Sequence, residues 1–267
     1  MRDTLHLYGS YLAASLRSQL QYRASFLMMT AAVGATSFLE FATVWALFER
    51  FGRLADWSLP EAAVLYGLVN VAFALSEALA RGFDDFPSMV RSGSFDRVLL
   101  RPRSTALQVA GSRIQLMRIG RLLQALLVLA WGAHALQIRW TLEQVGIACL
   151  AIGGGVALFS GLLVLQATFS FWSTESLEVF NIATYGGVET TQYPLSVYRR
   201  ELRTFFTWFV PLATVTYFPT LAILNRSDPL GSTRAFQTWC PLLGWLFLAI
   251  CLQIWEIGVR HYRSTGS

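Results

Sequence analysis

Six apolar runs, each long enough to cross the roughly 30 Å hydrocarbon core of a bilayer, dominate this 267-residue chain. They lie at residues 24–48, 61–81, 120–137, 145–171, 205–224 and 237–258. Only 14% of the residues are charged, whereas a soluble domain carries about 25%. Because a backbone in lipid must satisfy its hydrogen bonds internally, runs of this length fold as helices. The sequence therefore predicts an all-α integral membrane protein with six transmembrane helices.

The residues before the first run have an amphipathic pattern. Between residues 3 and 22, apolar side chains recur at helical spacing, at Leu5, Tyr8, Leu12, Leu16 and Leu20. We expect an interfacial helix with Arg17 and Arg23 at the lipid headgroups. An ordinary cytosolic helix is the alternative that the pattern leaves open.

The distribution of arginine predicts the orientation. Residues 81–121 hold eight arginines, whereas the links 49–60 and 138–144 hold two and one. Placing the five arginines from Arg81 to Arg103 in lipid would cost on the order of 12–17 kcal/mol, so this segment lies outside the bilayer. An excess of arginine marks the cytoplasmic side. The tail after residue 259 is basic as well, and we expect both termini in the cytoplasm.

The segment 173–224 allows two topologies. In the first, residues 176–193 form a polar-faced fifth span, and residues 205–224 form a re-entrant pair of short helices. In the second, residues 176–203 stay in the cytoplasm and residues 205–224 are the fifth span. A helix-like start at Ser173 and two prolines within 205–224 favour the first topology, whereas the three arginines just before residue 205 favour the second.

Composition also excludes several classes of enzyme. All 21 basic residues are arginines, and P-loop NTPases, protein kinases and Schiff-base enzymes each need a lysine. Cys149, Cys240 and Cys251 lie in apolar runs without a CxxC pair, so we expect neither a disulfide nor a metal site. Arginines at the ends of apolar runs explain the net charge of +5 without nucleic acid. No catalytic constellation is visible, and we predict that the chain is not an enzyme.

Two motifs resemble those of a known family. Ser92-Gly93-Ser94-Phe95-Asp96, followed by Leu99-Leu100-Arg101-Pro102, resembles the G-x-(L/F)-D-x-x-L-L-(R)-P stretch of ABC-2 type transporter permeases. Tyr193-Pro194 with Tyr198, and the later Pro211 and Pro219, are similar to the region after the fifth span of the same family. The resemblance is to a bacterial branch of six-span permeases that are paired with a separate ATPase, and it covers almost the whole chain.

The resemblance implies a fold and a role. It favours the first topology, with residues 194–224 re-entrant, and it makes residues 83–102 a cytoplasmic coupling region that contacts the ATPase. We expect a short helix there with Phe83, Phe86 and Val90 exposed for docking. The residues expected to couple to the ATPase are Phe83, Asp84, Asp85, Phe86, Met89, Val90, Gly93, Phe95, Asp96, Arg101 and Pro102.

The resemblance also implies an assembly. The working unit is expected to hold two permeases, identical or homologous, and two ATPase subunits that bind ATP and magnesium, in a bacterial inner membrane. This chain itself would hold no cofactor. ATP hydrolysis in the partner would drive export of a substrate, and a lipid-like molecule, a peptide or an antibiotic fits the apolar spans equally.

Polar residues inside the spans are candidates for function. Those that we expect to line a translocation path are Thr36, Glu40, Thr43, Asn70, Glu178, Asn181 and Glu189. Hydrogen bonding between helices of one subunit is the alternative role. For Glu77 that structural role is favoured, because Arg81 follows four residues later and can pair with it.

A second class of function also fits the buried carboxylates. An ion-coupled secondary transporter or channel would use Glu40, Glu178 and Glu189 as proton or cation sites. Such folds are commonly built from internal repeats, and the sequence shows no convincing one. The exporter is therefore the preferred interpretation.

Overall fold

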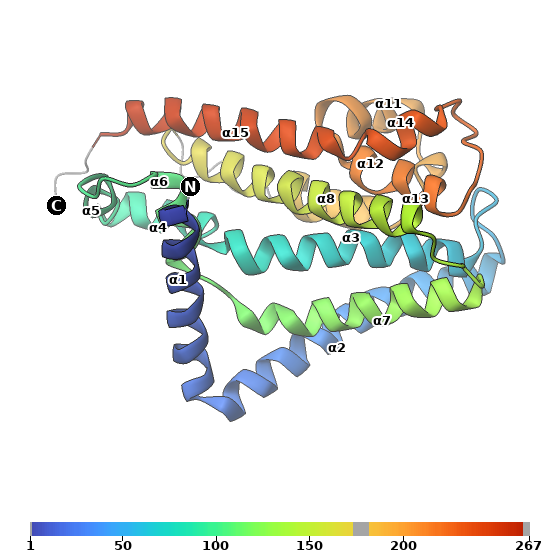
Figure 1. Cartoon of the computed structure of the whole chain (residues 1–267), viewed down its shortest axis with the longest axis horizontal. Coiled ribbons are helices and arrows are strands. Elements are labelled where there is room, and N and C mark those ends of the chain that lie inside the picture. The colour runs from blue at the N-terminus through green and yellow to red at the C-terminus, as the bar shows by residue number, and fades with distance from the viewer. Residues whose placement is uncertain (1, 173–181, 264–267) are drawn as a thin grey trace.

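The computed structural model describes residues 2–172 and 182–263, and within them almost every element is a helix. Five helices long and apolar enough to cross a membrane run along one another (Figure 1). They are α2 (Arg23–Phe51), α3 (Leu59–Ala80), α7 (Ile119–Ala135), α8 (Leu142–Phe169) and α15 (Leu242–His261). The prediction of a helical integral membrane protein is thus confirmed. A sixth span is reached only if one bent helix pair is counted.

Polar caps set where two of the spans begin. Before α3, the backbone N–H of Ser58 donates to Glu61 Oε2 at 2.7 Å. Before α8, the Thr141 N–H donates to Gln144 Oε1 at 3.1 Å and the Gln144 N–H donates to Thr141 Oγ1 at 3.3 Å. Such capping boxes satisfy N–H groups that a helix start leaves free. Both helices therefore begin two or three residues earlier than the apolar runs indicate.

Glycines bring the spans close together. A Cβ atom added to Gly120 of α7 would lie 2.1 Å from the carbonyl oxygen of Thr30 in α2. One added to Gly244 of α15 would lie 2.1 Å from the carbonyl oxygen of Gly154 in α8. Small residues allow this approach, which is how helices associate where no hydrophobic effect drives them together.

The N-terminal helix α1 (Arg2–Gln21) runs across the long helices, as Figure 1 shows. The Tyr8 hydroxyl donates to the Leu79 carbonyl oxygen at 2.5 Å, and Gln19 bonds the backbone of both Ile114 (2.7 Å) and Leu116 (3.1 Å). Leu16 and Leu20 remain exposed and are free to contact lipid. The predicted amphipathic helix is present, and polar contacts fix it to the rest of the protein.

Residues 81–121, with their eight arginines, lie at one end of the bundle, together with the first and last described residues (Figure 1). We call this the arginine-rich end. Five short elements connect α3 to α7 there. They are η1 (Arg81–Phe83), α4 (Phe86–Arg91), α5 (Asp96–Leu99), α6 (Thr105–Ser112) and η2 (Leu116–Arg118).

Short helices also gather at the opposite end of the bundle (Figure 1). They are η4 (Leu195–Val197), α11 (Arg200–Thr204), η5 (Phe205–Phe209), α12 (Leu212–Val215), α13 (Tyr217–Ile223) and α14 (Arg234–Trp239). The segments Arg200–Phe209 and Leu212–Ile223 are bent by 73° relative to each other. Pro211, which lacks a backbone N–H, lies at the break.

The ends of these segments show the path of the chain after α8. Phe171 packs on Trp255 at the arginine-rich end, with ring centroids 5.3 Å apart. η3 (Ile182–Gly186) and α10 (Gly187–Thr191) then lie between α3 and α8. Ser196 lies beside Tyr217 at the opposite end, and Arg226, just beyond α13, pairs with Glu61 near the start of α3 at 3.0 Å. Phe171 and Ser196 therefore lie at opposite ends of the bundle, whereas Ser196 and Arg226 lie at the same end.

Candidate functional site

A buried carboxylate surrounded by arginines lies near the arginine-rich end. The side chain of Glu77, in the last turn of α3, is 0% exposed. Its oxygens lie 2.8 Å from Arg81, 3.2 Å from Arg118 and 3.7 Å from Arg121. A buried charge is tolerated only with such partners, because desolvation costs several kcal/mol per ion. The predicted Glu77–Arg81 pair is therefore present, within a larger cluster.

The cluster joins elements that are far apart in the sequence. Arg121 of α7 also binds Glu40 of α2 at 2.5 Å, and Arg81 binds Asp84 at 2.8 Å. Tyr185 of η3 accepts a hydrogen bond from Arg81. We call Glu40, Glu77, Arg81, Asp84, Arg118 and Arg121 the ionic cluster. It contains three carboxylates and three guanidinium groups, so its formal charge is zero.

A pocket of about 310 Å³ lies beside the ionic cluster. We call it the polar pocket. It is lined by Val33, Thr36, Ser37, Glu40, Phe73, Arg118, Arg121, Tyr185, Val188, Glu189 and Gln192. These residues come from α2, α3, η2, α7, η3, α10 and the residue after α10, so the pocket lies where three spans meet the segment that follows α8.

The predicted coupling region, residues 83–102, is built on an aromatic cluster. The ring of Phe86 lies 4.7 Å from Trp255, 4.9 Å from Phe95 and 5.0 Å from Phe171, centroid to centroid. Phe83 packs on Trp255 at 5.3 Å. The expectation that Phe83 and Phe86 are exposed for docking is therefore wrong, because both rings are buried against Trp255 of α15. Val90 is partly buried.

What the predicted coupling region does expose is its tip, at α5. Leu100 is 85% exposed and Leu99 is 39% exposed. The exposed arginines around them are Arg91, Arg97, Arg101 and Arg103. We call these six residues the α5 tip. Gly93, with φ of 66°, lets the chain reverse direction between α4 and α5. α5 ends before Pro102.

One known protein family matches most of the chain. The family described as ABC-2 family transporter protein matches residues 33–266, which is most of the chain. This chain belongs to that family. No curated protein and no solved structure matches it significantly. The family is one of membrane transport components, so the ABC-2 protein is a multi-pass permease, and helix α1 precedes the matched region.

The ABC-2 protein brings together some of the predicted path residues and not others. Thr36, Glu40 and Glu189 line the polar pocket. Thr43 bonds its own helix at Leu39 on an exposed face, and Asn70 donates to the carbonyl oxygen of Tyr66 inside α3. The two remaining candidates, Glu178 and Asn181, lie outside the described residues.

Sequence reasoning missed Arg118, Arg121 and Tyr185 as members of the site, whereas it predicted Arg81. Arg118 and Arg121 enter the sequence argument only as part of the positive charge between two spans. In the structure they reach back to Glu77 and Glu40. Each lies within one turn of the start of α7, and an arginine that close to an apolar run is the signal that could have marked them.

The other predicted coupling residues have separate places. Asp84 joins the ionic cluster, while Asp85 pairs with Arg113 at 2.6 Å. Met89 is partly buried beside the aromatic cluster, and Asp96 lies in the first turn of α5. Arg101 and Pro102 are exposed. The predicted region 83–102 therefore divides into a buried base and an exposed tip.

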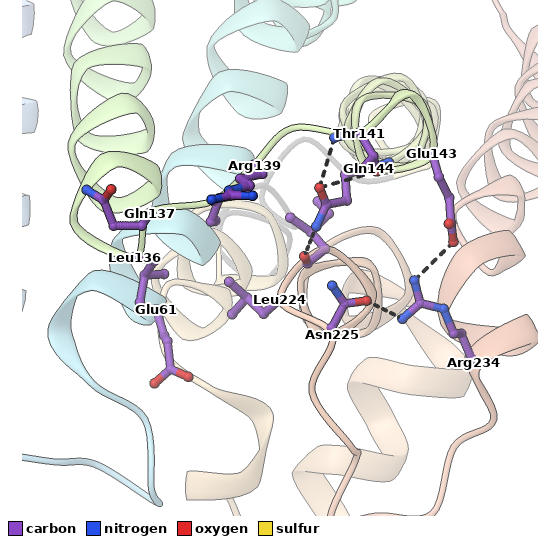
Figure 2. Close-up of a pocket in the computed structure, with 12 residues that line it drawn as sticks. Glu61, Leu136, Gln137, Arg139, Thr141, Glu143, Gln144, Leu224, Asn225 and Arg234 are labelled. Carbon is purple, nitrogen blue, oxygen red and sulfur yellow. Dashed lines mark hydrogen bonds and ion pairs between the residues drawn. The ribbon is translucent and has the colours of Figure 1, made fainter.

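A second polar pocket, of about 450 Å³, lies at the opposite end of the bundle (Figure 2). Arg234 bridges Glu143 at 3.0 Å and Asn225 at 2.7 Å, and Gln144 donates to the Ile223 carbonyl oxygen at 2.8 Å. The remaining carboxylate, Glu61, pairs with Arg226. Because both carboxylates of this pocket already have arginine partners, its polar groups tie α8 and the adjoining loops together.

Proposed function

We propose that this permease is the membrane subunit of an exporter driven by ATP hydrolysis in a partner subunit. The observation that carries the proposal is the α5 tip, in which an exposed leucine pair and four exposed arginines lie in one segment above a buried aromatic cluster. Apolar anchors with a charged rim are the composition of a protein interface, and the arginines require an acidic partner surface. The chain has no lysine, which supports the proposal that P-loop chemistry belongs to that partner.

The ionic cluster gives the tip a route to the spans. A push on α5 moves the aromatic cluster, which packs on α15, and moves η1, which carries Arg81. Arg81 holds Glu77, and Glu77 shares its oxygens with Arg118 and Arg121 at the start of α7. Through Arg121 the movement reaches Glu40 of α2 and the wall of the polar pocket. Closure of the ATPase would thus change the shape of that pocket.

In this proposal the arginine-rich end is cytoplasmic and both termini lie there. Residues 171–196 are then the fifth crossing and 194–224 a re-entrant region on the outer side. Support comes from the path of the chain, because Phe171 and Ser196 lie at opposite ends of the bundle whereas Ser196 and Arg226 lie at the same end. The rival topology, with 205–224 as the fifth span, requires those two ends of the bent pair to be apart.

The complete exporter is proposed to contain two copies of an ATPase and a second permease, identical or homologous, in a bacterial inner membrane. ATP and magnesium would bind in the ATPase subunits. The ion-coupled alternative is less well supported, because Glu40 is already neutralised by Arg121.

Co-purification tests the proposed function. A tagged chain is expressed with a candidate ABC-type ATPase from the same genome, and the complex is isolated from membranes. We expect the ATPase to be retained and to hydrolyse ATP, whereas the tagged chain alone hydrolyses none. Transport that continues with a nucleotide-free chain and an ion gradient would instead support the secondary transporter.

A further inference from the structure

We propose that the polar pocket binds the cationic group of a small amphipathic molecule, with Glu189 as its counter-ion. This inference rests on the proposed transport function and adds the class of substrate. It concerns the one carboxylate in the pocket lining that is not neutralised within the described part of the chain.

The first step is the charge balance of the lining. Arg118 and Arg121 are both engaged, since they lie 3.2 Å from Glu77 and 2.5 Å from Glu40 respectively. Glu189 forms no ion pair within 4.0 Å with any of residues 8–172 or 184–263, whose side chains the structure describes. The pocket and its ionic cluster therefore carry one uncompensated negative charge, located at Glu189.

The second step is the position of that charge. Glu189 lies in α10, within the proposed fifth crossing, and it is exposed at the mouth of the pocket. An ionised carboxylate within a membrane span is costly when no positive charge compensates it. A ligand that brings a positive charge removes this cost, whereas an anionic ligand would add to it.

The third step is the shape and polarity of the lining. Val33, Phe73 and Val188 supply apolar surface, and Thr36 and Gln192 supply polar groups close to Glu189. A volume of about 310 Å³ is at the lower end of the range of roughly 300–1,000 Å³ found for sites of drug-sized ligands. A primary or quaternary ammonium on a short apolar body satisfies both the charge and the apolar walls.

The test uses three probes with the same alkyl chain and different head groups, on the purified permease in nanodiscs of phosphatidylcholine. Octylammonium, octanoate and octanol are titrated while the unfolding midpoint is followed by tryptophan fluorescence. We expect a saturable stabilisation by octylammonium only, because a ligand that binds the folded state raises the midpoint. Glu189→Gln should need at least about tenfold more octylammonium for half-saturation, consistent with loss of one charge-assisted contact.

Two further variants make the result specific. Glu201→Gln removes an exposed carboxylate of α11, outside the pocket, and should bind as the unchanged protein does. Glu189→Asp keeps the charge and should retain binding better than Glu189→Gln, which provides a second comparison if Glu189→Gln folds poorly. Equal stabilisation by octanol, or an unchanged octylammonium response in Glu189→Gln, would overturn the inference.

The outcome is separable from that for the proposed function. Co-purification with an ATPase does not depend on octylammonium, so an ATPase partner without octylammonium binding removes only the substrate class. Binding through Glu189 without any ATPase partner would leave the pocket in place and remove the ATP-driven exporter.

Discussion

Arg81, in the first turn after α3, lies 2.8 Å from Glu77 and 2.8 Å from Asp84. It therefore joins a membrane span to the predicted coupling region, residues 83–102. Two more arginines, from the start of α7, share the same carboxylate. The cluster therefore connects the part of the chain proposed to receive motion with the spans proposed to move.

The first prediction concerns this carboxylate. Glu77→Gln keeps the side-chain volume, removes the carboxylate that pairs with Arg118, and gives the ionic cluster a net charge of +1. We expect a loss of about 3–5 kcal/mol in the free energy of unfolding, the range for breaking a buried pair. Thermal unfolding of the purified variant in detergent measures it. Glu201→Gln, at an exposed position, is the control and should change the midpoint little; equal midpoints for the two variants would contradict the assigned burial.

A second prediction separates the base of the coupling region from its tip. Phe86→Ala empties the centre of the aromatic cluster and should cost about 3–5 kcal/mol of stability. Leu100→Asp places a negative charge on an 85% exposed position among arginines and should leave the unfolding midpoint unchanged. The same variant should weaken retention of the ATPase at least about tenfold, since a leucine anchor is lost and the positive rim is partly neutralised.

The roles would be reversed if the sequence-based docking model were correct. In that case Phe86→Ala would abolish ATPase binding while remaining fully stable, and Leu100→Asp would bind normally. Measuring the unfolding midpoint and the retention of the ATPase for both variants distinguishes the two arrangements.

A third prediction concerns the contact between α2 and α7. Gly120→Ala adds a methyl group 2.1 Å from the carbonyl oxygen of Thr30, so one helix must shift. We expect a destabilisation of about 1–3 kcal/mol, the usual cost of overpacking. Gly146→Ala in α8, where no atom lies within 4 Å of the added methyl, is the matched control and should be neutral or slightly stabilising. Similar unfolding midpoints for the two variants would rule out the close contact.

A fourth prediction addresses topology. In a background with the three native cysteines replaced, Val197→Cys and Ser227→Cys each present a thiol at an exposed position, one before and one after the bent pair. We expect a membrane-impermeant maleimide to label both from the outer side of intact cells. Ser92→Cys in the coupling region should be labelled only after the membrane is opened. Labelling of Val197→Cys from the inside alone would establish residues 205–224 as the fifth span.

The sequence by itself determines which segments cross the membrane and which link them. It does so through the hydrophobicity of the apolar runs and the free-energy cost of placing arginine in lipid. Runs of apolar residues require helices in lipid, and the arginines of 81–103 cannot remain there, so spans and links follow from local composition. The Gly93 reversal and the helix before the first span are also local properties, and both are present in the structure.

The tertiary structure decided which charges meet and which aromatic rings are buried. Glu77 and Arg81 are four residues apart, and the sequence predicts that pair correctly. Arg121 binds Glu40 across 81 residues, and Trp255 covers Phe86 from the far end of the chain. A one-dimensional pattern cannot give these partners, because the energy of an ion pair or a ring contact depends on distance in space. The functional assignment of the predicted coupling region changed accordingly, from a docking helix at Phe86 to an exposed tip at Leu100.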